Sequence, residues 1–244
     1  MSIKSVLLFA VMAVGHAIRS DESFHCGAPA PTKDQLEIMR GFAAQEAIDI
    51  QAGNVTTMAI TVPVWLHAVS ATQGGLSSDA TLQNQFNTLR DGFAPHSITL
   101  TYAGSTRTVN AQWANEGNGN EMAMKRSLRK GNYRTMNFYI VDVLPSASGY
   151  CYYPTNAAPG SDAVIRDGCT LAKGAIGKIA VHEAGHWFGL MHTFEGNNCN
   201  GQGDLVADTP VQAGPSSGCP TGRDSCPGKP GLDPIHNFMD YSAP

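Results

Sequence analysis

Three histidines and one glutamate have the spacing that a catalytic zinc site requires, and they lie in the segment HEAGHWFGLMH, residues 182–192. Residues four apart on a helix differ by about 400° of rotation, so His182 and His186 project from one face and can bind one metal ion. Glu183 lies beside them, close enough to contact a water molecule on that ion. Three neutral imidazoles leave a fourth position for water, which is typical of a catalytic zinc and not of a structural one.

The third histidine can join the other two only if the helix ends between them. On a continuous helix, His192 would lie about 600° and roughly 9 Å beyond His186. Gly189 lies between the two, and glycine accepts the positive φ that a sharp helix exit often needs. The alternative is an amphipathic helix with incidental histidines, but chance would add this glycine and this histidine to the HExxH pattern only in roughly 1 of 300 cases.

This motif resembles that of the metzincin metallopeptidases, whose pattern continues to a methionine-containing turn below the metal. A segment of that kind, NFMDY, follows at residues 237–241. Together with HEAGHWFGLMHTF at 182–194 and GDLVADTP at 203–210, it is similar to the pappalysin family, in particular its small secreted fungal and microbial members. The resemblance extends from about residue 62 to residue 242. It implies that Met239 forms the hydrophobic floor under the zinc and that Tyr241 stabilises the oxyanion.

The function expected from the motif and the resemblance is that of a secreted zinc-dependent endopeptidase acting on peptides or proteins. Zinc held by the three histidines would activate a water molecule, and Glu183 would act as its general base. An alternative from another class is a truncated, catalytically impaired zinc-binding protein that serves as a decoy or substrate-binding module. A zinc amidohydrolase of small molecules is disfavoured, because the motifs match endopeptidases throughout. The resemblance also implies structural calcium at Asp204, Asp208 and Thr209, with a surface loop capped by its own side chains as the alternative.

Six cysteines allow fifteen pairings. By the resemblance, Cys199 is expected to pair with Cys226, and Cys219 with a cysteine just beyond the methionine turn that this sequence does not contain. We expect Cys151 and Cys169 to pair across the loop before the active-site helix. Some family members carry a cysteine-glycine pair whose thiolate occupies the open zinc position of the zymogen, and Cys26 is a candidate for this cysteine switch. A disulfide from Cys26 to Cys219, or to a partner beyond the C-terminus, is the competing interpretation.

The N-terminus predicts export. Residues 1–17 combine one lysine, an apolar run from 6 to 14 and small residues suited to signal peptidase, and that run is too short to span a bilayer. No later stretch approaches eighteen apolar residues, so we expect an extracellular protein without a membrane anchor. The segment Asn54-Val55-Thr56 is an acceptor sequon for N-glycosylation. The net charge is −4 and the sequence has no run of basic residues, so there is no electrostatic reason to expect binding to nucleic acid. We also expect a monomer.

The predicted elements form an α+β domain. Helices are predicted at 34–50, 78–93, 120–129 and 171–190, the third with a basic face, and strands at 59–69, 98–102 and 135–144. We expect a metzincin-type zincin in which a twisted mixed β-sheet is backed by two long helices, above an irregular lower subdomain with the methionine turn. In the family an edge strand pairs with extended substrate, and residues 162–166 or the region 144–153 are the candidates.

The expected organisation has three parts. It consists of a signal peptide at 1–17, a leader at 18–55 and a metzincin catalytic domain at 56–244. A chain of 244 residues with 42% hydrophobic content can bury one such core. Family members continue into a C-terminal helix past the methionine turn, so the domain is expected to be truncated at its C-terminus.

Overall fold

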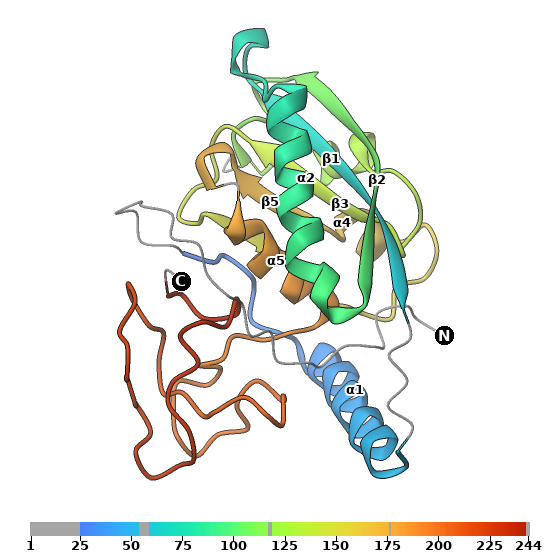
Figure 1. Cartoon of the computed structure of the whole chain (residues 1–244). Coiled ribbons are helices and arrows are strands. Elements are labelled where there is room, and N and C mark those ends of the chain that lie inside the picture. Colours follow the sequence, from blue (N-terminus) through green and yellow to red (C-terminus); the bar gives the residue numbers. More distant parts are fainter. Residues whose placement is uncertain (1–24, 54–58, 117–118, 176, 243–244) are drawn as a thin grey trace.

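The computed structural model describes residues 25–53, 59–116, 119–175 and 177–242. Its central element is a five-stranded sheet (Figure 1). The strand order is β2 (Ile98–Val109), β1 (Ile60–Ser70), β3 (Met136–Val141), β5 (Cys169–Ala172) and β4 (Gly149–Cys151). The first four strands are parallel, and β4 runs antiparallel to β5 at the edge of the sheet.

Two helices, α2 (Asp79–Phe93) and α5 (Lys178–Phe188), cover one face of this sheet (Figure 1). Helix α2 begins where the Ser78 side chain accepts a hydrogen bond from the Thr81 amide, and its apolar residues recur at intervals of three and four. Its buried apolar side chains pack on β1 and on α5 in one continuous core, to which α2 contributes Leu82, Phe86, Leu89 and Phe93. The expected sheet with helices behind it is therefore confirmed, and α5, which carries the zinc motif, lies directly on the sheet.

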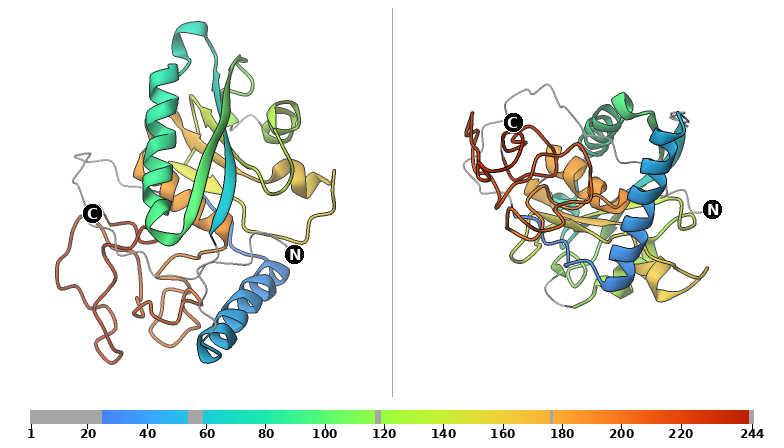
Figure 2. Two further views of the ribbon diagram at one scale, coloured as in Figure 1. Left: turned by 45° about the vertical axis from the view of Figure 1, so that its right-hand side comes forward. Right: turned by 90° about the horizontal axis from the view of Figure 1, so that it is seen from below.

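The opposite face carries α3 (Glu121–Leu128) and α4 (Asp162–Arg166), as Figure 2 shows from the side. The basic face expected for α3 is not exposed as a whole, because Lys125 is completely buried. Its ammonium group donates to the Arg166 carbonyl at 2.8 Å and pairs with Glu121 at 2.8 Å. It also lies 4.7 Å from the Tyr152 ring centroid. A buried lysine needs such partners to remain charged, and the sequence pattern could not reveal them.

The remaining described elements are helix α1 (Lys33–Gln51) and three short 3₁₀ turns, Gln73–Gly75, Ala94–His96 and Lys173–Ala175. The α1 helix begins with a capping box between Thr32 and Gln35. It packs through Met39 against Tyr153 and Met191, next to the irregular segment that follows α5. The first half of α1 thus contacts the region around the metal motif, and its C-terminal half projects from the molecule with Ile48 and Ile50 exposed (Figure 1).

Of the two candidates for the edge strand, the region 144–153 contains β4 at the edge of the sheet, whereas residues 162–166 form helix α4 because Ser161 caps a helical turn there. The helix predicted from residue 171 begins only at Lys178, because Leu171 pairs with Ile140 inside the sheet and Gly177 adopts a φ of 108°. The strand predicted at 98–102 continues to Val109.

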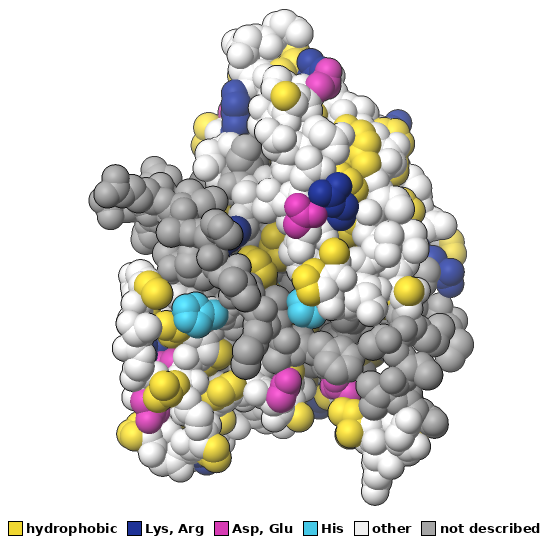
Figure 3. All heavy atoms as spheres, viewed as in Figure 1, with side chains coloured by type: hydrophobic (Ala, Val, Ile, Leu, Met, Phe, Trp, Pro, Cys, Tyr) yellow, Lys and Arg dark blue, Asp and Glu magenta, His cyan; other side chains and the backbone are white. Residues whose placement is uncertain are grey.

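The expected signal peptide at residues 1–17 and the sequon Asn54-Val55-Thr56 both lie outside the described residues. Within the described part of the chain, no helix has the length and apolar character needed to cross a bilayer. On the face drawn in Figure 3, lysine and arginine side chains are scattered and do not gather into a patch.

Candidate metal centre

Helix α5 places two imidazole rings side by side. The ring centroids of His182 and His186 are 4.8 Å apart, and both residues are buried. His182 donates from Nδ1 to the Phe238 carbonyl at 2.6 Å, and His186 donates from Nδ1 to the Leu190 carbonyl at 2.8 Å. A carbonyl can only accept, so both rings carry their proton on Nδ1 and present an Nε2 lone pair, as a metal ligand requires.

The helix ends at Gly189, which has a φ of 98°. The Gly189 amide bonds the His186 carbonyl, and the Leu190 amide bonds the Gly185 carbonyl, in the manner of a Schellman motif. The chain therefore turns back and brings the His192 ring to 4.6 Å from that of His186. The buried Nε2 of His192 has no hydrogen-bond partner in the part of the chain that the structure describes.

Cys26 of the leader joins these histidines. One ligand atom from each of Cys26, His182, His186 and His192 lies within 4.8 Å of all the others, and no other such group of metal-binding side chains occurs among the described residues. Burial lowers the pKa of His182 to about 3, and that of His186 falls well below its ordinary value for the same reason. Neutral imidazoles are the form that binds a cation.

Glu183 is completely buried beside this cluster. Its Oε2 accepts a hydrogen bond from the Cys26 thiol at 3.5 Å, and its Oε1 has no hydrogen-bond partner among the described residues. Burial raises the pKa of Glu183 from 4.5 to about 8. A methyl group at Gly149 would come within 3.0 Å of the Glu183 Cγ, so the edge strand β4 passes directly over this carboxyl.

The methionine turn closes the site from below. Met239 is buried, and a Cβ added to Gly185 would overlap its sulfur. The Met239 amide donates to the Asn237 side chain at 2.9 Å, and its carbonyl accepts from the Thr193 amide at 3.3 Å. The Tyr241 ring lies 5.2 Å from His192, edge to face, which brings this phenol to the metal site.

A buried polar network that the sequence did not predict links the third histidine to this turn. The side chain of Thr193 donates to Gln212 at 2.7 Å, and Gln212 donates to Asp240 at 3.1 Å. The Ser216 amide donates to the same carboxylate at 3.0 Å. Nothing in the local sequence marks Gln212, since its role depends on contacts with residues 19 and 28 positions away.

The leader reaches the site as an extended segment along β4. The Ser148 amide donates to the His25 carbonyl at 2.7 Å, and the Gly27 amide donates to the Gly149 carbonyl at 2.7 Å. Cys26 and Gly149 form a parallel bridge. Gly27 permits this approach, because a Cβ there would lie 2.7 Å from that of Ala147.

The other cysteines are not members of the four-residue cluster. The structure joins Cys151 to Cys169 and Cys199 to Cys226, and the first of these bonds links β4 to β5. Cys219 is an exposed free thiol. The pairing of Cys26 with Cys219 that we considered is wrong, since Cys26 lies in the metal cluster.

The loop at residues 204–209 contains a hydrogen bond between its own residues. Asp204 is buried, and its Oδ1 accepts from the Val206 amide at 3.0 Å. Asp208 is exposed. Burial raises the pKa of Asp204 to about 6.

The fold and the site together define a metallopeptidase of the metzincin class. A family model described as pregnancy-associated plasma protein-A matches residues 120–244. An extracellular metalloprotease of Podospora anserina is 47% identical over 248 residues, which cover 93% of this chain and 84% of the relative. One of Neurospora crassa is 45% identical over 259 residues, which cover 99% and 90%.

Two solved structures of another protein have a fold similar to that of this chain. A mutant of promirolysin from Tannerella forsythia has a TM-score of 0.65 at 20% identity, over 90% of this chain and 87% of that one. Mature mirolysin of the same organism, in complex with a cleaved peptide, has a TM-score of 0.59 at 22% identity, over 76% and 85%. The chain belongs to the pappalysin family and is a secreted metalloendopeptidase.

Proposed function

We propose that the chain is the latent form of a zinc-dependent endopeptidase, with Glu183 as general base and Cys26 as the group that blocks the metal. The observation that carries this proposal is the convergence of three imidazole rings on one point beside a buried carboxyl.

The residues present fit a zinc ion. Neutral imidazole nitrogens and a thiolate are the donors that zinc prefers in proteins. The backbone carbonyls of Phe238 and Leu190 fix the orientation of two of the rings. His182, His186 and His192 would hold the ion, and Cys26 would be the fourth ligand of the latent form.

A bound zinc supplies Lewis acidity, which acidifies a water molecule and polarises the scissile carbonyl. With the metal bound, Glu183 would be the residue that accepts a proton from the attacking water and passes it to the leaving amine. Burial raises the pKa of Glu183, and a cation bound beside it would lower it again. The Tyr241 phenol donates a hydrogen bond to the oxyanion that develops on the substrate. Met239 packs against α5 and so keeps the two metal ligands of this helix, His182 and His186, in place.

The leader is the inhibitory element of this proposal, and we place its end near residue 55, before the catalytic domain at 56–244. The Cys26 Sγ lies 3.4 Å from the His186 Nε2 and 3.5 Å from the Glu183 Oε2. From the protein's own groups alone, burial and the negative charge of Glu183 raise the pKa of the thiol. A divalent cation opposes both effects and favours the thiolate.

Calcium at Asp204, Asp208 and Thr209 is not part of this proposal. The hydrogen bond from the Val206 amide uses one oxygen of Asp204 for the loop itself. That contact is what a loop capped by its own side chains requires.

Replacing Glu183 by glutamine tests the catalytic role. The test is made in the Cys26→Ser background, which lacks the blocking thiol. There we expect E183Q to keep its zinc, measured by atomic emission, and to lose hydrolysis of a generic protein substrate by a factor on the order of 10²–10⁴. The exposed Glu37 gives a matched control, E37Q, which should retain activity. A zinc-loaded Cys26→Ser protein that keeps most of its activity after E183Q would refute the assignment. A folded, zinc-loaded Cys26→Ser protein without any hydrolysis would favour the decoy.

A further inference from the structure

The segment 149–153, which contains the edge strand β4, forms one wall of the metal site. A Cβ added to Gly149 would lie 3.0 Å from the Glu183 Cγ, so the backbone of the segment is in close contact with this carboxyl side chain. Four residues further on, the Tyr153 ring packs edge to face on the His186 ring, with 5.1 Å between the centroids. The position of this segment therefore bears on both the expected general base and a metal ligand.

The two side chains between these contacts point to the other side of the sheet. Successive residues of a strand face opposite sides. Cys151 packs in the core that α5 shares, whereas Tyr150 and Tyr152 pack in the separate core that α3 covers (Figure 2). The rings of the two tyrosines meet edge to face, with 5.6 Å between their centroids. Both are thus placed to hold the segment from the side opposite the metal site.

A set of buried polar contacts, which we call the lysine cage, binds these tyrosines to α3 and the residues before it. The ammonium group of the fully buried Lys125 lies 4.7 Å from the ring centroid of Tyr152 and 5.3 Å from that of Tyr150. It pairs with one oxygen of Glu121 at 2.8 Å, and the Tyr152 hydroxyl donates to the other oxygen at 3.0 Å. The Tyr150 hydroxyl donates to Glu116 at 2.6 Å. The lysine cage consists of these five residues.

The strand itself provides little to fix its position. The β4 strand has only three residues and pairs with β5 alone within the sheet, whereas a typical strand has five or six. The disulfide between Cys151 and Cys169 ties it sideways to β5 but does not set its distance from α5. Cation–π contacts and hydrogen bonds to a carboxylate are strong when they are buried. The lysine cage supplies the restraint that so short an edge strand lacks.

We propose that Lys125 is a positioning residue for the peptidase reaction, which acts through the lysine cage. It touches neither the metal ligands nor the substrate, but it sets the place of the segment 149–153 against Glu183 and His186. This role in catalysis rests on the proposed function.

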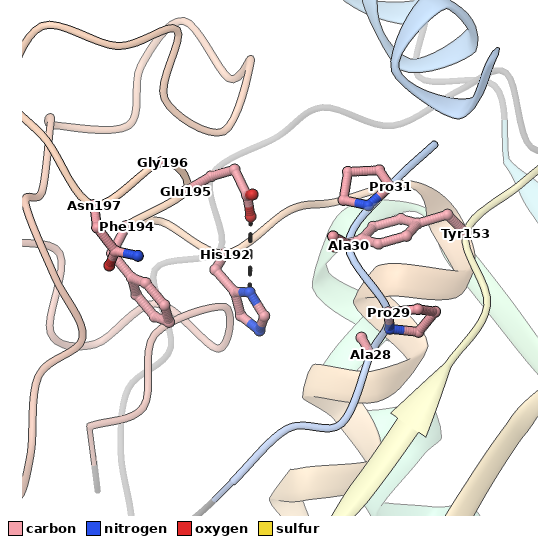
Figure 4. A pocket seen from close by; sticks show the side chains of 10 residues that line it. All are labelled: Ala28, Pro29, Ala30, Pro31, Tyr153, His192, Phe194, Glu195, Gly196 and Asn197. Atoms are coloured by element: carbon pink, nitrogen blue, oxygen red, sulfur yellow. Dashed lines mark ion pairs between the residues drawn. The ribbon is translucent and has the colours of Figure 1, made fainter. Parts of the chain in front are cut away.

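The same segment is the edge on which the leader docks. The Gly27 amide donates to the Gly149 carbonyl at 2.7 Å. Figure 4 shows the leader residues 28–31 beside Tyr153, with which they line a pocket. The lysine cage therefore also stabilises the docked leader, and this part of the proposal does not depend on hydrolysis.

The first test uses the latent full chain and needs no activity. With Cys219→Ser, the buried Cys26 is the single free thiol, because the other cysteines form disulfides. Its rate of alkylation by iodoacetamide under native conditions measures how often the leader leaves the segment. Tyr152→Phe removes the hydroxyl that bonds Glu121, and we expect it to raise this rate about 10-fold.

Leu82→Ala is the control for a general loss of stability. Leu82 is fully buried in α2, in the core on the other face of the sheet. Its truncation should destabilise the whole protein more than Tyr152→Phe does, and chemical denaturation measures both effects. If global unfolding exposed Cys26, Leu82→Ala would give the faster alkylation. We expect the reverse order, because the lysine cage acts on the docking edge.

The second test measures peptide hydrolysis by the zinc-loaded full chain with Cys26→Ser. Lys125→Met is combined with Glu121→Gln, so that no buried carboxylate is left without its counter-ion and the variant keeps its fold. We expect kcat to fall about 10-fold and KM to change by less than about threefold, because the segment contacts groups that act on the scissile bond. Zinc content and the folded fraction are measured in each variant. The exposed Lys130 gives the matched control, Lys130→Met, which should keep kcat.

Two outcomes would overturn the positioning role. One is an alkylation rate that follows the free energy of unfolding alike in Tyr152→Phe and Leu82→Ala. The other is an unchanged kcat in the folded, zinc-loaded variant that lacks the charges of Lys125 and Glu121. If Cys26→Ser hydrolyses nothing, the proposed function fails, and the alkylation rates alone decide on the lysine cage.

Discussion

Met239 lies directly against the backbone of Gly185, one residue before the second histidine of the cluster. A Cβ at residue 185 would overlap the Met239 sulfur, and its methyl carbon would also be only 3.2 Å away. The glycine between Glu183 and His186 is thus a packing requirement. It lets the methionine turn press on α5 at the level of the metal ligands.

Gly185→Ala is expected to destabilise the protein by about 1–3 kcal/mol, because the overlap must be relieved by moving the turn or the helix. Chemical denaturation gives the free energy of unfolding, and zinc content reports on the ligands. The control is Gly41→Ala in α1, where nothing lies within 4 Å of an added Cβ. That change should be neutral or stabilising by up to about 1 kcal/mol. Equal effects of the two substitutions would contradict the packing role.

Cys26→Ser is expected to remove latency. In the cobalt(II)-substituted full chain, a thiolate ligand produces a sulfur-to-metal charge-transfer absorption, which we expect in the wild type and not in C26S. Hydrolysis of a peptide should rise at the same time, because water can then occupy the fourth position. Cys219→Ser is the matched control, since this thiol is exposed and does not belong to the metal cluster. An identical spectrum in wild type and C26S would rule out the thiol as a ligand.

Asp167→Asn should cost about 3–5 kcal/mol of stability, because it leaves a buried arginine without its counter-ion. Asp167 and Arg129 form an ion pair of 3.2 Å with side chains only 2% and 4% exposed. The same carboxylate accepts from the Trp187 indole at 3.1 Å, next to His186. Tryptophan fluorescence during denaturation therefore reports the loss. The exposed pair of Arg126 and Asp162 supplies the control, Asp162→Asn, with an expected loss below about 1 kcal/mol.

The stability of the protein should fall between about pH 6.5 and pH 4 in part because of His67. This ring is buried and bonded to Thr106 at 2.8 Å and Asn137 at 3.0 Å, and burial lowers its pKa from 6.5 to about 4. The unfolded chain binds the proton first, so the native state loses on the order of 3 kcal/mol across this range. The slope of the unfolding free energy against pH gives the number of protons taken up on unfolding. In His67→Gln, this number should be smaller by up to about one. An unchanged slope would show that His67 does not cause the loss.

The amino-acid sequence by itself determined the parts of the site that depend on local spacing. His182, Glu183 and His186 share one helical turn, and Gly189 lets the chain leave the helix toward His192, so their proximity follows from helix geometry. Helical periodicity likewise predicted α2, and alternation or a continuous apolar run predicted β1, the start of β2 and the fully buried β3, whereas β5 was not predicted.

Only the tertiary structure decided the contacts between distant segments. Cys26 meets Glu183 across 157 residues, and this required the leader to bond beside β4. The burial of Lys125 among tyrosine rings and the Gln212 network likewise depend on side chains from separate elements. Local periodicity carries no information about such pairings, because burial and close packing are set by the whole fold.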